Sequence, residues 1–258
     1  MGSPVLYIRN CLCNNHDKGK MKYPSILLLV LFSLSLRAQQ PEQNALQELY
    51  QDLLHPSDPL LNGREYKYYF HPHLSTPLIP KDLLPSASVV IREKQYQNVM
   101  LLYDTYKDQV VYYNPNTLYN NMIITVIVNS DIIEEFTLQL QSGQARFKYL
   151  AFPENQEGLL SNGFYEIVSE GACKFIIDHS SVKKIKEGMV AYQYTTERYI
   201  ISSGAVYRIK GKKSLLKALS DQAAEVNDYL KRTKVQVRTA DKEQLKEVLD
   251  YYTGLKHS

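Results

Sequence analysis

Short segments with a two-residue hydrophobic period dominate the chain from Ser88 to Ile209. This period is typical of half-buried β-strands. Strands are expected at residues 89–91, 96–103, 108–113, 122–128, 136–140, 145–151, 164–168, 174–178, 181–186, 189–194, 198–202 and 205–209. Turn-forming sequences separate them, among them Asn114-Pro115-Asn116, Ser142-Gly143 and Glu187-Gly188. Consecutive strands joined by tight turns predict an antiparallel meander, arranged as a barrel, a sandwich or two packed sheets.

The flanking segments have a helical period instead. Residues 42–54 are predicted to form a helix with one apolar stripe, and a proline-rich extended segment follows up to residue 87. Apolar stripes over 213–232 and 241–255 predict two amphipathic helices in a C-terminal αα-hairpin. The expected fold class is therefore α+β, mainly β, with segments at 39–87, 88–211 and 212–258.

The first 38 residues have the pattern of an export signal. Lys20 and Lys22 precede an almost unbroken apolar run at 26–36, and the small Ala38 follows it. This order is typical of a secretory signal peptide. The run is shorter than the ~20 residues that span a bilayer, which disfavours an uncleaved anchor. We interpret Met21 as the true start and 1–20 as a gene-model extension, with a long n-region as the alternative.

Removal of the leader changes the charge and the cysteine content. Five of the 30 Lys and Arg residues and one of the 27 Asp and Glu residues precede residue 39, so the exported chain carries 25 and 26, a net charge of −1. Nucleic acid is therefore not an expected partner. Cys173 is the one cysteine left, so no internal disulfide is expected. Its strand-like surroundings predict a buried small hydrophobe rather than a catalytic thiol.

A basic run lies between the predicted sheet and the predicted helical hairpin. It contains no acidic residue and comprises Arg208, Lys210, Lys212, Lys213 and Lys217. One interpretation is contact with an anionic surface by charge attraction. The alternative is a solvated face near a helix. The segment Gly211-Lys212-Lys213-Ser214 lacks the first glycine of a phosphate-binding loop, so we exclude that motif.

The sequence contains no convincing catalytic or metal-binding pattern. His71 and His73 could offer two ligands, but no carboxylate stands at a recognised spacing. Carboxylates such as Asp104, Asp108 and Asp131 are scattered, and the nucleophile-elbow and zinc-protease motifs are absent. No cofactor and no metal are predicted. Strand charges and the helical C-terminal segment also disfavour a transmembrane barrel.

Tyrosine is the unusual aromatic: the sequence has 21 Tyr, 7 Phe and no Trp. A tyrosine-lined surface suits glycan or protein recognition, because the ring gives contact area and the hydroxyl gives direction. The alternative is that tyrosine replaces Phe and Trp at the margins of a half-exposed sheet.

Several short motifs resemble an uncharacterised family of exported Bacteroidota proteins. They are Leu61-Asn62-Gly63-Arg64-Glu65-Tyr66, the segment 95–104, Tyr199-Ile200-Ile201, Val206-Tyr207-Arg208-Ile209, the segment 212–219 and Tyr251-Tyr252. The resemblance covers most of residues 60–256. It implies an envelope or secreted location and no assigned activity. Lys94-Gln95 stands where those proteins usually carry glycine, which argues against a tight two-residue turn there.

The sequence therefore predicts an exported, non-catalytic protein of the cell envelope with a binding or assembly role. Its partner would be an envelope protein or a glycan, and no transmembrane span is expected after leader cleavage. The expected location is the periplasm or the outer membrane, with secretion as a further outcome. The alternatives are a hydrolase or binding protein for envelope glycans, and a small-molecule carrier.

Overall fold

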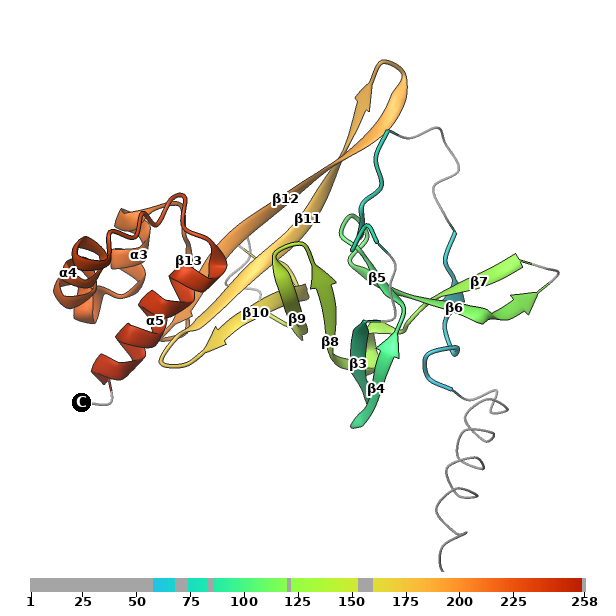
Figure 1. Ribbon diagram of the computed structural model, residues 1–258, viewed down its shortest axis with the longest axis horizontal. Helices are drawn as coiled ribbons and strands as arrows, with labels where there is room; N and C mark the ends of the chain where they lie inside the picture. Colours follow the sequence, from blue (N-terminus) through green and yellow to red (C-terminus); the bar gives the residue numbers. More distant parts are fainter. Residues whose placement is uncertain (1–57, 68–73, 83–85, 120–121, 153–159, 257–258) are drawn as a thin grey trace, which may run out of the picture. The chain divides into compact units, whose positions relative to one another are not determined.

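The computed structural model describes residues 58–67, 74–82, 86–119, 122–152 and 160–256. These residues form two antiparallel β-sheets followed by three helices (Figure 1). The prediction of a mainly β chain with C-terminal helices is confirmed. The leader and the expected helix at 42–54 lie outside the described residues.

The larger sheet has eight strands in the order β13-β12-β11-β10-β9-β8-β3-β4. Their bounds are β3 Ala87–Ile91, β4 Lys94–Val99, β8 Ile133–Leu140, β9 Gly143–Leu150, β10 Gly163–Glu170, β11 Lys174–Lys186, β12 Met189–Ser202 and β13 Ala205–Arg208. Strands β8 to β13 are neighbours in both sequence and space, which is the predicted meander. A short 3-10 turn, η1 (Ser130–Ile132), precedes β8.

The smaller sheet has five strands in the order β1-β7-β6-β5-β2. The bounds are β1 Arg64–Glu65, β2 Leu78–Ile79, β5 Leu101–Asp104, β6 Gln109–Tyr119 and β7 Met122–Ile127. The two-residue strands β1 and β2 form its edges, so the proline-rich segment contributes only at an edge, as expected from the missing N–H of proline.

The chain changes sheets between β4 and β5, inside the segment 96–103 predicted as one strand. Asn98 has a φ of 54°, and the register with β3 shifts beside Ala87. Such a bulge bends a strand. Leu101 then pairs with Tyr112 of the smaller sheet. The prediction of one continuous strand is wrong here, because residues 96–103 serve two sheets.

The hairpin turn between β3 and β4 is tighter than the sequence indicated. Arg92 and Glu93 both have positive φ, as do Glu187 with Gly188 and Ser203 with Gly204. Two consecutive positive φ values are characteristic of two-residue hairpin turns. The sequence argued against such a turn before Lys94, and the register of Ile91 with Lys94 corrects that prediction.

Strands β6, β11 and β12 are longer than predicted. β6 continues through Asn114-Pro115-Asn116, where its register with β7 shifts. β11 joins the two segments expected at 174–178 and 181–186, and β12 joins those at 189–194 and 198–202. No Gly or Pro separates these pairs of segments, and β-branched residues such as Thr195 and Thr196 favour an unbroken strand.

Three helices complete the described chain: α3 Lys212–Ala218, α4 Ala223–Thr233 and α5 Lys242–Lys256. The single helix expected over 213–232 is broken by a 3-10 turn, η3 (Ser220–Gln222). Ser220 and Asp221 compete with helical hydrogen bonding through their short polar side chains, which accounts for the break. The expected αα-hairpin is therefore a three-helix arrangement.

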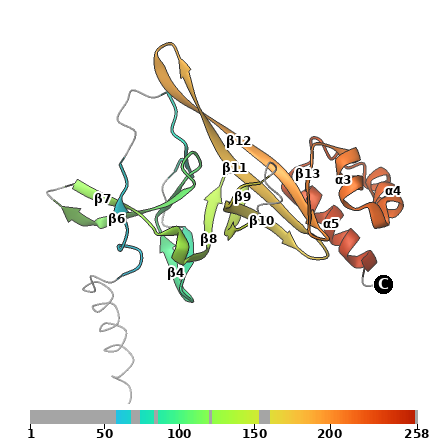
Figure 2. The same ribbon diagram turned by 180° about the vertical axis from the view of Figure 1, so that it is seen from behind.

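The helices cover one face of β10 to β13 (Figures 1 and 2). Their predicted stripes are buried against the sheet: Leu215, Leu219, Val226 and Leu230 from α3, its C-cap and α4, and Leu245, Val248, Leu249 and Tyr252 from α5. Phe175, Ile177 and Ile200 are the sheet's contribution to this helix-side core. A second, aromatic core contains Tyr103, Phe136, Phe147 and Phe164.

Among the described residues, the structure has no helix that is both long and apolar enough to cross a membrane.

Candidate functional site

A buried polar network lies at the junction of the sheet and helix α5. Glu166 of β10 and His179 of β11 are only 3% and 4% exposed. His179 Nε2 lies 2.7 Å from one Glu166 oxygen, and the Lys242 ammonium of α5 lies 2.7 Å from the other. Tyr194 of β12 places its hydroxyl 2.5 Å from His179 Nδ1. Glu166 and His179 together therefore link four elements.

The network separates the two apolar cores on the same face of the larger sheet. Glu166 pairs across the strands with Phe147 of the aromatic core on one side and Ile177 of the helix-side core on the other. The His179 ring packs against Phe147 at a centroid distance of 5.1 Å. A charged side chain at this position is stable only because its oxygens have partners.

The partners of Glu166 keep it ionised. Burial by itself raises the pKa of this carboxyl, but hydrogen bonds and charge from His179 and Lys242 outweigh burial and hold the pKa below its usual value. Burial, together with the charges of Glu166 and Asp178, raises the pKa of Tyr194 to about 12. Tyr194 as a whole residue is 43% exposed, while its hydroxyl lies against His179.

An ionised carboxylate can only accept hydrogen bonds. Glu166 therefore accepts from Nε2–H of His179, and Nδ1 of the same ring forms a hydrogen bond with the Tyr194 hydroxyl. Both ring nitrogens are thus engaged within the protein. Lys242 also donates to the backbone oxygen of Gln144 at 3.1 Å. These residues therefore link α5 to four strands, β9 to β12, and we call this network the clamp.

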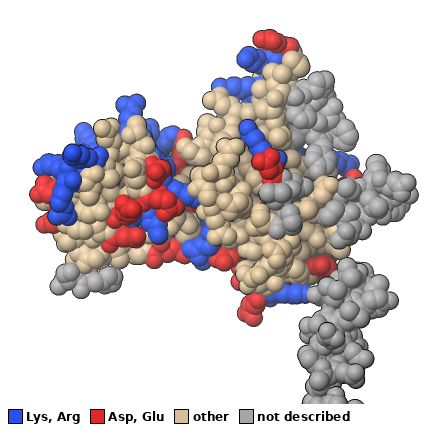
Figure 3. Space-filling view, viewed as in Figure 1, with Lys and Arg blue, Asp and Glu red and all other residues tan. Residues whose placement is uncertain are grey.

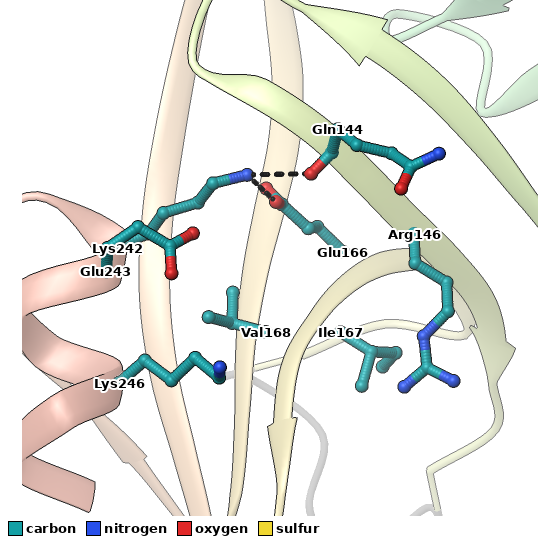
Figure 4. Close-up of a pocket in the computed structure, with 8 residues that line it drawn as sticks. All are labelled: Gln144, Arg146, Glu166, Ile167, Val168, Lys242, Glu243 and Lys246. Atoms are coloured by element: carbon teal, nitrogen blue, oxygen red, sulfur yellow. Dashed lines mark hydrogen bonds and ion pairs between the residues drawn. The ribbon is translucent and has the colours of Figure 1, made fainter. Parts of the chain in front are cut away.

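A small pocket of about 140 Å³ opens beside this clamp (Figure 4). It is lined by Gln144, Arg146, Glu166, Ile167, Val168, Lys242, Glu243 and Lys246. Most of its charges are already paired: Arg146 with Glu170 at 2.8 Å, and Lys242 with Glu166. The pocket could hold water or a small ion, and its size does not fit a sugar chain or a larger ligand.

The distal end of the β11–β12 hairpin is the second notable surface. We call residues 182–190 the hairpin tip. Ile185 is 78% exposed and Val182 54%, the two highest values among the exposed large hydrophobic residues of the described chain. Glu187 and Gly188 form its two-residue turn.

The hairpin is braced just below and along this tip. The Ser181 hydroxyl lies 2.7 Å from that of Thr105, and the Ser181 N–H donates to the Thr105 oxygen at 3.0 Å. On the β12 side, the Leu74 N–H donates to the Val190 oxygen at 2.8 Å, and Ser75 exchanges hydrogen bonds with the Tyr192 backbone. The orientation of the tip is therefore fixed by contacts outside the hairpin.

Lysines surround the exposed apolar residues of the tip. Lys183, Lys184 and Lys186 are all exposed, and none forms an ion pair with the described residues. Glu187 is the one acidic residue of the segment. Figure 3 shows charged side chains gathered at the far end of the hairpin as it is placed in Figure 1.

The basic run predicted from the sequence lies elsewhere, between β13 and α3. Arg208 forms an ion pair with Glu197 of β12. Lys210 precedes α3, whereas Lys212, Lys213 and Lys217 lie in it, and all four are exposed. Ser214 accepts hydrogen bonds from the N–H groups of Lys210 and Gly211, so the segment rejected as a phosphate-binding loop forms a local helix cap.

Two of the scattered carboxylates have structural partners. Asp104 is fully buried and accepts from the N–H groups of Tyr106 and Lys107 and from the Tyr66 hydroxyl. Asp108 accepts from the Tyr103 hydroxyl at 2.6 Å and from the Phe164 N–H. His71 and His73 lie outside the described residues. Within the residues that are described, no group of three or more His, Cys, Asp or Glu side chains is placed to hold a metal ion.

Cys173 is 4% exposed in the helix-side core, and burial, with Asp221 nearby, raises the pKa of its thiol to about 11. The ordinary value is 9.0. At pH 8 the thiolate fraction should therefore be about 100-fold smaller than in an unfolded chain. We expect a thiol-specific dye to label residues 39–258 at least that much more slowly in buffer than in denaturant. Equal rates would contradict this burial.

Sequence reasoning missed the clamp and the tip. The available signal for the clamp was one carboxylate inside the apolar segment 164–168 and one histidine between the strands expected at 174–178 and 181–186. For the tip it was a lysine-rich stretch interrupted by Ile185 before a Glu-Gly turn. Neither signal shows which distant residues become neighbours.

No protein-family model, no curated protein and no solved structure matches this chain.

Proposed function

We propose that the protein is an exported, non-catalytic component of the cell envelope that works by binding. The observation that carries the proposal is the hairpin tip, which presents Ile185 and Val182 to solvent at 78% and 54% exposure. Single exposed apolar residues are common on protein surfaces, but the two most exposed aliphatic side chains of the described chain both lie on this braced tip, among exposed lysines. The leader pattern at 1–38 and the resemblance to exported Bacteroidota proteins support the location, in the periplasm or at the outer membrane.

The strongest cluster of titratable groups supports a structural interpretation. Both nitrogens of His179 and both oxygens of Glu166 have partners within the protein. A general base must instead reach a substrate proton directly or through one water. The clamp therefore favours a binding protein over the hydrolase alternative.

The aromatic core bears on the carrier alternative. Phe136 stacks on Phe147 at 4.8 Å, and Tyr103 and Phe164 lie within 5.7 Å of Phe136. These rings fill the space that an apolar ligand would need in this part of the sheet. This filled core therefore argues against the small-molecule carrier alternative.

The test is fractionation of cells that express the full chain with a C-terminal tag. We expect the chain to lose its leader and to be recovered with the envelope fraction. An Ile185→Asp variant should shift to the soluble fraction, whereas Tyr149→Asp, at an exposed site on β9, should not. Recovery in the cytosol with the leader intact would overturn the proposal.

A further inference from the structure

We propose that the hairpin tip docks on an anionic phospholipid membrane. The inference rests on the proposed function, since it names the partner of the same surface. It combines two observations on residues 182–190, namely exposed apolar side chains and uncompensated positive charge. Peripheral proteins that bind membranes reversibly commonly use both.

The register of β11 with β12 shows how the tip is built. Lys183 faces Tyr192 and Ile185 faces Val190, so these four side chains share one face of the hairpin. Val182, Lys184 and Lys186 lie on the other face, opposite Gln193, Ala191 and Met189. Each face therefore carries an exposed aliphatic residue and at least one lysine.

This distribution fits insertion end-on into a membrane surface. A groove on a protein partner would contact one face of a hairpin, and apolar residues would then gather on that face. A membrane interface surrounds an inserted tip on all sides. Ile185 lies two residues before the turn on one face, and the partly exposed Met189 directly follows the turn on the other. Lysine side chains can bury their stems and keep the ammonium at headgroup level.

The positive charge of the tip favours binding to an anionic membrane over a neutral one. Three lysines and Glu187 give residues 182–190 a net charge of +2, although the exported chain is −1 overall. Each lysine near an anionic surface strengthens binding by about fivefold. The bracing of Ser181 by Thr105 and of Val190 by Leu74 holds the tip in place before binding, which limits the entropy lost on docking.

The basic run at Arg208 to Lys217 lacks the apolar half of this combination. Its aliphatic neighbours Ile209, Leu215 and Ala218 are buried in the helix-side core, and Arg208 is paired with Glu197. The run can supply electrostatic attraction alone. It therefore provides a matched control for charge.

The test is co-sedimentation of residues 39–258 with vesicles. We expect binding to equimolar phosphatidylglycerol and phosphatidylcholine, and none to phosphatidylcholine alone. The triple variant K183Q/K184Q/K186Q should bind about 100-fold more weakly, and Ile185→Ser about tenfold. The control K210Q/K212Q/K213Q, with the same change in charge, should stay within about threefold of wild type. Thermal unfolding should be unchanged in all three variants.

The outcomes separate this inference from the proposed function. Absence of vesicle binding, equal binding to both lipids, or loss in the control but not in the tip variant would overturn membrane docking by the tip. If the chain still fractionates with the envelope through Ile185 while vesicles do not bind, the partner is a protein or glycan and the proposed function stands. If vesicles bind through the tip but the chain stays in the cytosol, export fails and the lipid contact stands.

Discussion

A Glu166→Gln variant is expected to lose about 3 kcal/mol of unfolding free energy at pH 7. The substitution keeps the shape of the side chain but removes the charge that holds Lys242 and His179. The Lys242 side chain is only 11% exposed, so its ammonium would lose its counter-ion in a poorly hydrated place. Because domains are stable by about 5–15 kcal/mol, this loss is a large share of the total. Urea unfolding measures it directly.

The pH dependence gives this prediction an independent check. The pKa of Glu166 is lower in the folded chain than its ordinary 4.5. The stability that its charge contributes is therefore fully present above about pH 4.5 and is lost as the pH falls through the lower folded value. We expect the difference between wild type and Glu166→Gln to be largest near neutral pH and to shrink below pH 4.5.

A neighbouring carboxylate on the same pocket wall provides the control. Glu243 is exposed, and Glu243→Gln should change the unfolding free energy by less than about 0.5 kcal/mol at any pH. A Glu166→Gln loss as small as that would show that the clamp contributes nothing to stability.

Phe136→Ala is expected to lower the unfolding free energy by about 4 kcal/mol. Phe136 is fully buried in β8 and contacts three other rings of the aromatic core, Phe147, Phe164 and Tyr103. Truncation removes its buried area and leaves a cavity, which rigid ring neighbours cannot close. Chemical denaturation should show a lower midpoint with an unchanged slope.

Tyr149→Ala is the matched control on the adjacent strand β9. Tyr149 also contacts Phe164, at 5.4 Å, but is 44% exposed. Its truncation should cost no more than about 1 kcal/mol, because little apolar area leaves a buried position. Similar losses for the two variants would mean that the four rings do not form a cooperative core.

The local sequence pattern predicted much of the larger sheet and of the helices. The turn at Glu187-Gly188 and the antiparallel order of β8 to β13 follow from it. The stripe Leu245, Val248, Leu249 and Tyr252 is buried as predicted. These features depend on residues that are close together in the sequence, so a single sequence is sufficient to indicate them.

The candidate sites were less accessible to the sequence. The basic run was visible as a sequence of neighbouring charges, but its pairing with Glu197 was not. Glu166 and His179 are 13 residues apart, and Glu166 and Lys242 are 76 apart. No periodic pattern connects positions at such separations, and the choice of partner depends on the register of three strands.

The sequence by itself determined the antiparallel β class, the apolar helix stripes and the two-residue turn at Glu187-Gly188, because backbone preference and side-chain alternation are local. Tertiary structure alone decided that residues 96–103 divide between two sheets, that the ionised Glu166 forms an ion pair with Lys242, and that Ile185 stays exposed among the described residues. Strand register and burial depend on packing between segments that are distant in the sequence, so no short stretch of the chain is sufficient to predict them.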